Sequence, residues 1–380
     1  MSSSAPRRVF ISAGEASGDL HASHLVTALR EQWPNTEFVG FGGPKLAENG
    51  IVLREDLVEN SVMGFLPVLL SIGSIVGTVA RFEQELCDEP PDLFLPVDYP
   101  GLHLNLSFLA KRHRVPVVSY IVPQVWAWAP WRLRRVARRA DRLLVILPFE
   151  EEIYSTVHPD VHFVGNPVFD HLAQLEGELP SPSSGERRTL AIFPGSRRQE
   201  VRGNLPSQLR VAKRVCAEDS RFEVVISVQR EALRSRVEEI LRAEKVDAQL
   251  EIGTPHALQS RADLALVCSG TATLEQAWFG TPMVVQYAAS DVDRRLYDLF
   301  SVAPHFALVN LFAGREVVPE VLFTPGDEEA LTRAALSLLD EGRRQEVRGD
   351  LALLRKQRFH GGAAESAAAR VVDFWKTGNR

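Results

Sequence analysis

Short apolar runs alternate with longer segments of mixed polarity along most of the chain. The runs have the length of buried strands, and the segments between them carry apolar side chains at helical spacing. In residues 19–33, for example, Leu25, Leu29 and Trp33 fall on one face. This alternation predicts parallel α/β sheets. The predicted strands are residues 9–12, 38–41, 92–97, 115–122, 143–147, 161–164, 190–193, 222–228 and 262–267.

A proline- and serine-rich stretch separates the chain into two halves. Residues 180–185 read PSPSSG, a composition that is typical of a linker. A chain of 380 residues has room for two domains of ordinary size. The predicted organisation is a first α/β domain over residues 1–171, a linker over 172–187, a second α/β domain over 188–350 and closing helices over 351–380.

Two predicted strands, one in each half, end in loops of glycine and serine that lead into a helix. The first loop is AGEASGD over residues 13–19, and the second is PGSR over 194–197. Free backbone N–H groups at such a helix start bind phosphate together with the helix dipole, and Arg197 adds a fixed positive charge. A third turn of this kind, SGTATLE over 269–275, suits a diphosphate. The pattern predicts two nucleotide-fold domains that face each other across a site.

Two carboxylates follow predicted strand ends. Asp98 comes directly after the strand over 92–97, at the sheet edge where ligands collect in open α/β folds. A carboxylate there can act as general base on a hydroxyl, and the alternative is a helix cap or a turn residue. Glu275 lies in the helix after the third loop, where a carboxylate can accept both hydroxyls of a ribose. A surface or capping glutamate is the alternative for this second position.

Residues 61–80 contain no charged side chain and are long enough to span a membrane. A proline and three glycines interrupt the segment, which argues against a span. Its pattern fits a helix that lies in a membrane surface or lines an apolar pocket, and it fits a buried core helix equally well. The apolar side of this helix carries Phe65, Leu69, Ile72 and Val76.

A cluster of arginines follows in residues 131–142. At helical spacing these side chains form a basic stripe, which suits anionic lipid or a phosphorylated substrate. A solvated face whose charges pair elsewhere is the alternative. The stripe consists of Arg135, Arg138, Arg139 and Arg142.

Composition and missing motifs exclude several classes. A hydrophobic share of 45% with 24% charged residues predicts a soluble globular protein, and a net charge of −6 gives no reason to expect nucleic acid. The three cysteines are far apart, which favours a reducing compartment over a disulfide framework or a zinc site. No signal peptide is recognisable, so a cytoplasmic location is expected. The chain contains no Walker A, HExxH, GxSxG or GxGxxG pattern and no metal-ligand cluster.

A series of motifs, in this order along the chain, resembles the lipid-A-disaccharide synthase family from about residue 9 to the last helices. The resemblance implies an inverting glycosyltransferase of the two-Rossmann GT-B type. Such enzymes join UDP-2,3-diacylglucosamine to 2,3-diacylglucosamine 1-phosphate, giving UDP and the β-1,6 disaccharide 1-phosphate of lipid A biosynthesis. The motifs are AGEASGD (13–19), VMG (62–64), VDYPGLHLNL (97–106), PQVWAW (123–128), LPFE (147–150), PGSRRQEV (194–201), SGTATLE (269–275), PMVV (282–285) and NLFAGREVVPE (310–320).

The resemblance also implies roles for single residues. Asp98 is the candidate base that removes the proton of the acceptor 6-hydroxyl, and Arg197 stabilises the leaving UDP without a metal. Glu275 is expected beside the uridine ribose. The diphosphate is expected at Gly195, Ser196, Arg197, Ser269, Gly270 and Thr271, and the acceptor side of the cleft at Gly14, Glu15, Ser17 and Asn310.

The partners follow from the same resemblance. The expected enzyme is a homodimer without a cofactor, since the UDP-sugar is a substrate. It binds the cytoplasmic face of the inner membrane peripherally, through the 61–80 segment and the arginine stripe on anionic lipid. Its closing helices have two placements, on the second domain or back on the first.

The sequence departs from the family pattern at Gln124, where serine is usual, at Leu102 or His103, where phenylalanine is usual, and over residues 286–304. These departures concern acyl-chain length and the exact acceptor. Three other functions compete. Another transferase that uses UDP-N-acetylglucosamine and a 2-epimerase have no need of the 61–80 segment. A non-catalytic lipid- or nucleotide-binding relative would have lost Asp98 or Arg197, and both are present.

Overall fold

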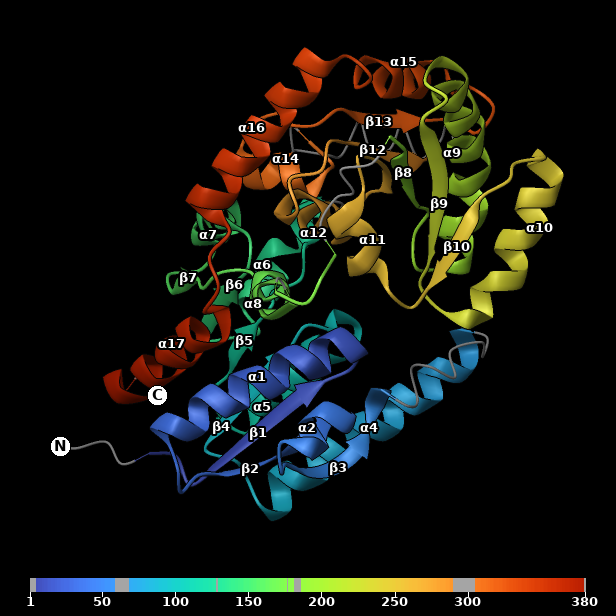
Figure 1. Cartoon of the computed structure of the whole chain (residues 1–380). Helices are drawn as coiled ribbons and strands as arrows, with labels where there is room; N and C mark the ends of the chain where they lie inside the picture. The colour runs from blue at the N-terminus through green and yellow to red at the C-terminus, as the bar shows by residue number, and fades with distance from the viewer. Residues whose placement is uncertain are drawn as a thin grey trace. The chain divides into compact units, whose positions relative to one another are not determined.

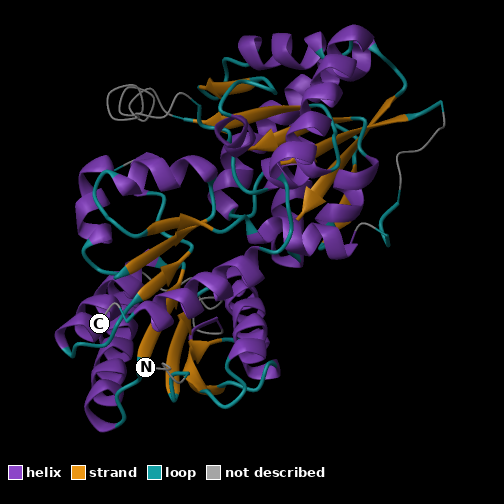
Figure 2. Ribbon diagram, turned by 90° about the vertical axis from the view of Figure 1, so that its left-hand side faces the viewer, coloured by secondary structure: helices purple, strands orange, loops and turns teal. Residues whose placement is uncertain are grey.

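The structure is a computed structural model that describes residues 5–58, 68–127, 129–175, 177–180, 186–289 and 305–378 (Figure 1). The chain folds into two compact units. The first unit contains Met1–Pro167 together with Gly362–Arg380, and the second contains Val168–Gly361. Helices lie on both sides of a parallel sheet in each unit (Figure 2).

The sheet of the first unit has seven parallel strands in the order β3-β2-β1-β4-β5-β6-β7. Six of them match predicted strands. The edge strand β3 was not predicted, because its residues are only half-buried and lack an apolar run. The strands are β1 (Arg8–Ala13), β2 (Glu37–Gly42), β3 (Val52–Asp56), β4 (Leu93–Val97), β5 (Val118–Tyr120), β6 (Arg142–Val145) and β7 (Val161–Phe163).

Two helical layers cover this sheet. Phe10 of β1 and Phe94 of β4 point to one face, where their rings pack against Phe82 of α4. Val9 and Ile11 point to the other face, in a core shared with α1 and the last helix, α17. The helices of this unit are α1 (Ala16–Gln32), α2 (Pro44–Glu48), α4 (Val68–Asp88), α5 (Pro100–Arg112), η1 (Val125–Ala127), η2 (Pro130–Arg132), α6 (Leu133–Ala137), α7 (Pro148–Ser155) and α17 (Ala363–Thr377).

The sheet of the second unit has six parallel strands in the order β10-β9-β8-β11-β12-β13. They are β8 (Arg188–Phe193), β9 (Phe222–Val228), β10 (Gln249–Ile252), β11 (Leu264–Cys268), β12 (Met283–Ala288) and β13 (Glu320–Phe323). Strands β10, β12 and β13 were not among the predicted ones, although the run MVVQ at the start of β12 is buried. The helices are α8 (Pro167–Leu175), α9 (Arg198–Glu218), η3 (Glu231–Leu233), α10 (Arg234–Glu244), α11 (Pro255–Arg261), α12 (Ala272–Trp278), α14 (Leu308–Ala313), α15 (Glu329–Ser337) and α16 (Glu341–Arg358).

Both sheets confirm the prediction of two Rossmann-like α/β domains. Counted from the first strand of each unit, the two orders run 3-2-1-4-5-6, which is the Rossmann arrangement. The strand order reverses between β1 and β4 in one unit and between β8 and β11 in the other. Ligands of such folds bind outside the carboxyl ends of the strands at this reversal. All four strands there lead into loops that the sequence singled out, and the reversal therefore positions the candidate site residues.

The last helix belongs to the first unit. Ala367, Val371 and Phe374 of α17 are buried in the same core as Leu25 and Leu29 of α1. The two helices lie side by side (Figure 1). Alanines on α17 allow the close approach of the two backbones. Of the two placements left open for the closing helices, α17 takes the first unit and α16 the second.

The predicted boundaries shift accordingly. The units divide after Pro167 rather than after residue 171, and α8 occupies the start of the predicted linker. The return to the first unit begins at Gly362, eleven residues later than the predicted start of the closing helices at residue 351.

The predicted arginine stripe is wrong at Arg142. Helix α6 ends at Ala137. Arg142 and the three apolar residues after it form β6 instead of continuing the helix. The Arg142 side chain is buried and forms ion pairs with Asp160 and Asp373, both at 2.9 Å. It therefore anchors α17 to the sheet and takes no part in a surface. Arg135 and Arg138 are exposed, and Arg139 is half-buried.

The uncharged segment is described only in part. Phe65 lies outside the described residues, and the side chains of Leu69 and Ile72, within α4, lie outside them as well. Val76 is 61% exposed on α4. Among the helices that the structure describes, none combines the length and apolar character needed to cross a membrane.

Replacing Phe374 by alanine tests how firmly α17 closes the first unit. The ring is 2% exposed, so its removal leaves a cavity between the sheet and α17, and we expect a loss of about 3–5 kcal/mol in the free energy of unfolding. The matched control is Leu353→Ala on α16, where the side chain is 48% exposed and a change within about 0.5 kcal/mol is expected. Urea unfolding measures both. Equal losses in the two variants would contradict the packing of α17 described above.

Candidate active site

The loops after β1 and β4 meet at the strand reversal of the first unit. Neighbouring positions Ala13 and Val97 pair at the carboxyl ends of these strands. Only glycine fits at position 14, because a Cβ built on Gly14 would lie 2.1 Å from the Tyr99 ring. A Cβ on Gly18 would lie 3.9 Å from the Cβ of Asp98. Gly14 and Asp98, which are far apart in sequence, thus belong to one compact site. Glu15, at the end of the same loop, and Ser17, in the first turn of α1, are both exposed.

Asp98 and Tyr99 form a strained turn between β4 and α5. Their φ angles are 54° and 50°, in the left-handed region that non-glycine residues rarely adopt. Ile121, directly after the neighbouring strand β5, is left-handed as well, with φ 59°. Each such residue costs about 1–2 kcal/mol relative to the right-handed conformation. Strain of this kind gathers at functional sites when the surroundings hold it in place.

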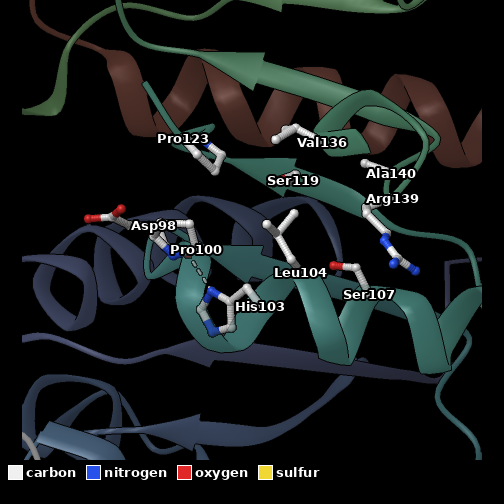
Figure 3. Close-up of a pocket in the computed structure, with 10 residues that line it drawn as sticks. All are labelled: Asp98, Pro100, His103, Leu104, Ser107, Ser119, Pro123, Val136, Arg139 and Ala140. Carbon is white, nitrogen blue, oxygen red and sulfur yellow. Dashed lines mark hydrogen bonds between the residues drawn. The ribbon is translucent and has the colours of Figure 1, made fainter. Parts of the chain in front are cut away.

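Burial tunes the carboxyl of Asp98. It raises the pKa of Asp98 above its ordinary value, a hydrogen bond from the Tyr99 backbone opposes the shift, and the negative charge of Glu15 adds to it. A carboxylate with a raised pKa is a stronger base than an exposed aspartate. In Figure 3 the carboxylate points away from the other labelled side chains, so it is presented to the surroundings of the turn rather than to the interior.

A small pocket of about 20 Å³ lies beside this turn, between α5, β5 and α6 (Figure 3). It is large enough for about one water molecule. Its wall includes His103 and Ser107 of α5, Ser119 of β5 and Arg139. The guanidinium of Arg139 also lies over the Phe108 ring, 4.3 Å from its centroid. Arg139 therefore lies along α5 at the end of the pocket away from Asp98 (Figure 3).

From the sequence alone, His103 stood out only as a departure from the family pattern. In the structure it is 4% exposed and lies directly below the turn. Its Nδ1 is 2.5 Å from the carbonyl oxygen of Asp98, and its Nε2 is 2.8 Å from Oγ of Ser12 in β1. Burial lowers the pKa of His103 to about 4, so the ring is neutral at neutral pH.

A buried glutamate organises the loop after β5, although sequence reasoning assigned it no role. The indole N–H of Trp126 donates to Oε1 of Glu150 at 2.9 Å, and the backbone N–H groups of Ile146 and Leu147 donate to Oε2 at 3.3 and 3.0 Å. Burial raises the pKa of Glu150 to about 7 against the effect of these donors. The glutamate at the third position of α7, after Leu-Pro-Phe, is the sequence signal of this capping arrangement.

Asp19, in the first turn of α1, has a structural role. Its carboxylate accepts the backbone N–H groups of Gly43 and Lys45 at 2.8 Å and of Leu46 at 3.2 Å. It therefore caps the start of α2, and the end of the AGEASGD motif fixes the loop after β2.

The PGSR turn of the second unit differs from its prediction. The backbone N–H groups of Ser196 and Arg197 are not free, because both donate to Oε2 of Glu200, at 2.8 and 3.1 Å. The Arg197 guanidinium pairs with the other oxygen at 3.3 Å. Gly195 allows the close turn: its φ is 112°, and a Cβ there would lie 2.5 Å from Glu200. A carboxylate of the protein itself thus sits where a phosphate is expected.

The third loop lies at the end of β11, next to β8 in the sheet. Ser269 donates its hydroxyl to the Phe306 carbonyl at 3.0 Å, and Gly270 and Thr271 lead into α12. Glu275 is half-buried on α12, where its Oε2 accepts a hydrogen bond from Gln259 at 2.9 Å and lies 3.8 Å from Nε2 of His256. Sequence reasoning missed both neighbours, since neither lies in a recognisable motif.

Asn310 does not present a polar group to a ligand, contrary to the expectation for a cleft residue. It is fully buried. Its amide N–H group donates to the Val318 carbonyl at 2.9 Å and to Glu320 at 3.1 Å, and its oxygen accepts the backbone N–H groups of Val317 and Val318. All its hydrogen-bonding capacity shapes residues 310–320. The sequence pattern predicted a polar loop over residues 310–316, but the first four of these residues belong to α14, and the Asn310 amide faces the interior.

No cluster of three or more metal-ligating side chains occurs within the described ranges. The charges near the candidate loops are those of arginines and carboxylates.

Comparison with known proteins gives a consistent result. The family model of lipid-A-disaccharide synthetase matches residues 9–372. The lipid-A-disaccharide synthase of Myxococcus xanthus is 36% identical over 98% of this chain and 99% of its own, and that of Syntrophus aciditrophicus is 34% identical over 97% and 98%.

Solved structures support the fold alone, since their sequences are distant. A UDP-N-acetylglucosamine 2-epimerase from Listeria monocytogenes, itself described as putative, has a TM-score of 0.65 at 15% identity and covers 98% of this chain and 96% of its own. The glycotransferase of kitacinnamycin has a TM-score of 0.58 at 16% identity, over 98% and 100%. The expected fold of two Rossmann-like domains, as in GT-B enzymes, is thereby confirmed.

Glu200→Gln tests whether the carboxylate competes with a diphosphate for the PGSR turn. Removing its negative charge from a helix N-terminus should strengthen UDP binding about two- to fivefold, since one such charge is worth about 0.3–1 kcal/mol. Calorimetric titration with UDP measures the effect, with Glu238→Gln on α10 as a control of equal charge change. Weaker binding by Glu200→Gln would instead make Glu200 a support for the turn.

Proposed function

The chain belongs to the lipid-A-disaccharide synthase family, and we propose from this premise which of its residues carry the reaction. It is a glycosyltransferase of lipid A biosynthesis. Its proposed substrates are UDP-2,3-diacylglucosamine as donor and 2,3-diacylglucosamine 1-phosphate as acceptor. The family match does not favour the alternatives of another UDP-sugar transferase, an epimerase or a non-catalytic relative.

In the proposed reaction the acceptor 6-hydroxyl oxygen attacks the anomeric carbon of the donor sugar. The bond from that carbon to the diphosphate oxygen breaks, and UDP leaves with the electron pair. A single displacement inverts the anomeric centre and gives the β-1,6 linkage. The proton of the attacking hydroxyl goes to a base, which we assign to Asp98.

One observation carries this assignment more than any other. Asp98 is a half-buried carboxylate with a raised pKa, held in a strained left-handed turn at the strand reversal of the first unit. Each of these features is expected of a general base: basicity, a fixed direction and a place at the ligand-binding edge. A helix cap, the alternative weighed for this position, needs no such environment.

The donor is assigned to the second unit. Negative charge develops on the leaving UDP, and the helix starts at Ser196–Arg197 and Gly270–Thr271 offer N–H groups and a guanidinium to it. For the diphosphate to use the first of these, it replaces the Glu200 carboxylate. Glu275 is proposed to accept the ribose hydroxyls from its half-buried position on α12. The reaction as written uses no cofactor, since the UDP-sugar is itself a substrate.

Acylated substrates require access to a membrane surface, and the first unit offers suitable side chains. Trp131 is 65% exposed in η2 and Phe108 is 45% exposed on α5. Arg135 and Arg138 are exposed in the segment that follows Trp131. Exposed aromatic rings beside arginines suit the interface of an anionic bilayer. We propose that this surface docks the enzyme on the cytoplasmic face of the inner membrane, where family members are also expected to act as homodimers.

Asp98→Asn tests the base. The variant keeps the shape of the side chain but not its proton affinity, so we expect a loss of about 10²–10⁴-fold in kcat with UDP binding retained. The assay is UDP release with and without the acceptor. In the wild type kcat/KM should fall on acidification at a pH above the usual range of aspartate, because the raised pKa means that Asp98 binds its proton at higher pH. Release without acceptor, or full activity of Asp98→Asn, would contradict the proposal.

Charge reversal at Arg135 and Arg138 tests the docking surface. Each arginine near an anionic membrane contributes about 1 kcal/mol of binding free energy. The double variant Arg135→Glu, Arg138→Glu should therefore bind phosphatidylglycerol vesicles more weakly by about tenfold or more. The control is Arg214→Glu, Arg333→Glu in the second unit, both exposed. Vesicle sedimentation measures binding. Equal binding by the two double variants, or undiminished binding by the first, would assign the membrane contact elsewhere.

A further inference from the structure

His103 links the candidate base to the first strand of its sheet. The ring lies between the Asp98 carbonyl oxygen and the Ser12 hydroxyl, at 2.5 and 2.8 Å. Ser12 is fully buried in β1, where it pairs with Pro96 of β4. The bridge therefore joins a rigid central strand to the backbone of the catalytic turn.

The partners determine which ring nitrogen carries the proton. A carbonyl oxygen only accepts hydrogen bonds, so Nδ1 of His103 must be the N–H donor. A neutral ring then has a bare Nε2, which accepts the hydroxyl proton of Ser12. Both nitrogens are in use inside the protein, and neither is available to take a proton from a substrate.

The bridge acts on the direction of the Asp98 side chain. The peptide before Asp98 is fixed because its N–H donates to the Tyr120 carbonyl at 3.0 Å. The peptide after Asp98 is fixed because its carbonyl accepts from His103. With both flanking peptides held, the bond from Cα to Cβ has one direction, and φ stays at 54°.

The second residue of the turn is held in the same way. Tyr99 packs its ring against Gly14 on one side and edge-on to His103 on the other, with the two ring centroids 5.9 Å apart. The His103 backbone N–H also donates to the Tyr99 carbonyl at 3.1 Å. One histidine thus contacts both left-handed residues, by its ring and by its backbone.

We propose that His103 is a positioning residue, which with Ser12 locks the left-handed Asp98–Tyr99 turn and so aims the Asp98 carboxylate at the acceptor hydroxyl. This inference rests on the proposed role of Asp98 as base. In Figure 3 the imidazole lies on one side of the Asp98 backbone and the carboxylate on the other, so the ring holds the backbone without covering the carboxylate. Without the bridge the turn can relax toward unstrained backbone conformations, and the carboxylate loses its fixed direction.

The central test compares two substitutions at one position. His103→Ala removes the ring, and we expect kcat to fall about ten- to a hundredfold, since a misplacement of about 1 Å costs up to this factor. Both KM values should stay within about twofold, because the side chain touches no substrate. His103→Asn should restore kcat to within about threefold of the wild type, because the asparagine N–H group occupies the place of Nδ1 and still donates to the Asp98 carbonyl. His113→Ala, at the other end of α5, is the control and should change nothing.

The pH at which kcat/KM falls on the acidic side separates this role from a general loss of stability, which would leave that pH unchanged. A released Asp98 carboxylate gains water, and its pKa falls toward the ordinary value. The limb of kcat/KM should therefore shift to lower pH in His103→Ala and stay in place in His103→Asn. An unshifted limb in His103→Ala, or a kcat loss that asparagine does not restore, would overturn the inference.

The protonated nitrogen of His103 can be measured in the wild-type protein, so this test does not depend on whether the variants fold. Long-range ¹⁵N–¹H correlation spectra of histidine-labelled protein should give His103 a proton on Nδ1 and none on Nε2. A proton on Nε2 would overturn the proposed bridge. The failure of the underlying function is distinguishable: if Asp98→Asn remains active, the base assignment fails, whereas an inactive Asp98→Asn beside a fully active His103→Ala refutes only the role of His103.

Discussion

The reversal of strand order in each sheet is the constraint on which the rest of the structure depends. Helices that follow β1 and β4 leave the sheet to opposite sides, so the carboxyl ends of these two strands border a crevice that no crossover helix fills. The same holds for β8 and β11. Because the loops of both pairs must turn sharply there, they require small residues and tolerate strain, which is why Gly14 contacts Tyr99 and Gly195 contacts Glu200. The candidate site residues are therefore concentrated at this edge of each sheet.

Much of this arrangement was predictable because it depends on local pattern. A buried parallel strand is a nearly continuous apolar run, and a loop for phosphate is rich in glycine and serine, so β1, β4, β8 and β11 and their loops follow from sequence. Asp98 and Arg197 were singled out in the same way, as charged residues in the loops that follow such runs. The half-polar edge strand β3 carries no such run and was missed.

What could not be predicted depends on contacts between distant residues. Arg142 continues the helical spacing of arginines, but Asp160 and Asp373 draw it into the sheet as the first residue of β6. Asn310 is polar and was expected in a polar loop, yet it lies buried in α14, and nearby backbone groups take most of its hydrogen bonds. His103 looked like a departure from a family pattern, and only its contact with Ser12, 91 residues earlier, gives it a role. In each case the sequence shows which residue is present, but the direction of its side chain depends on distant contacts that the sequence does not show.

The two units hold their charged groups in different ways, and the proposed reaction explains the difference. In the first unit His103 and Glu150 are buried and Asp98 is half-buried, and the surrounding hydrogen bonds hold all three in place. The reacting hydroxyl of the acceptor is neutral and attracts its base weakly, so the base must be aimed before the substrate arrives. In the second unit the Arg197 side chain is 75% exposed and its partner is a single carboxylate on the next helical turn. A diphosphate attracts its own ligands strongly and must leave after every turnover, so an exchangeable partner serves better there than a fixed one. A rigid site for the neutral reacting hydroxyl and a displaceable site for the diphosphate are therefore what the proposed transfer requires.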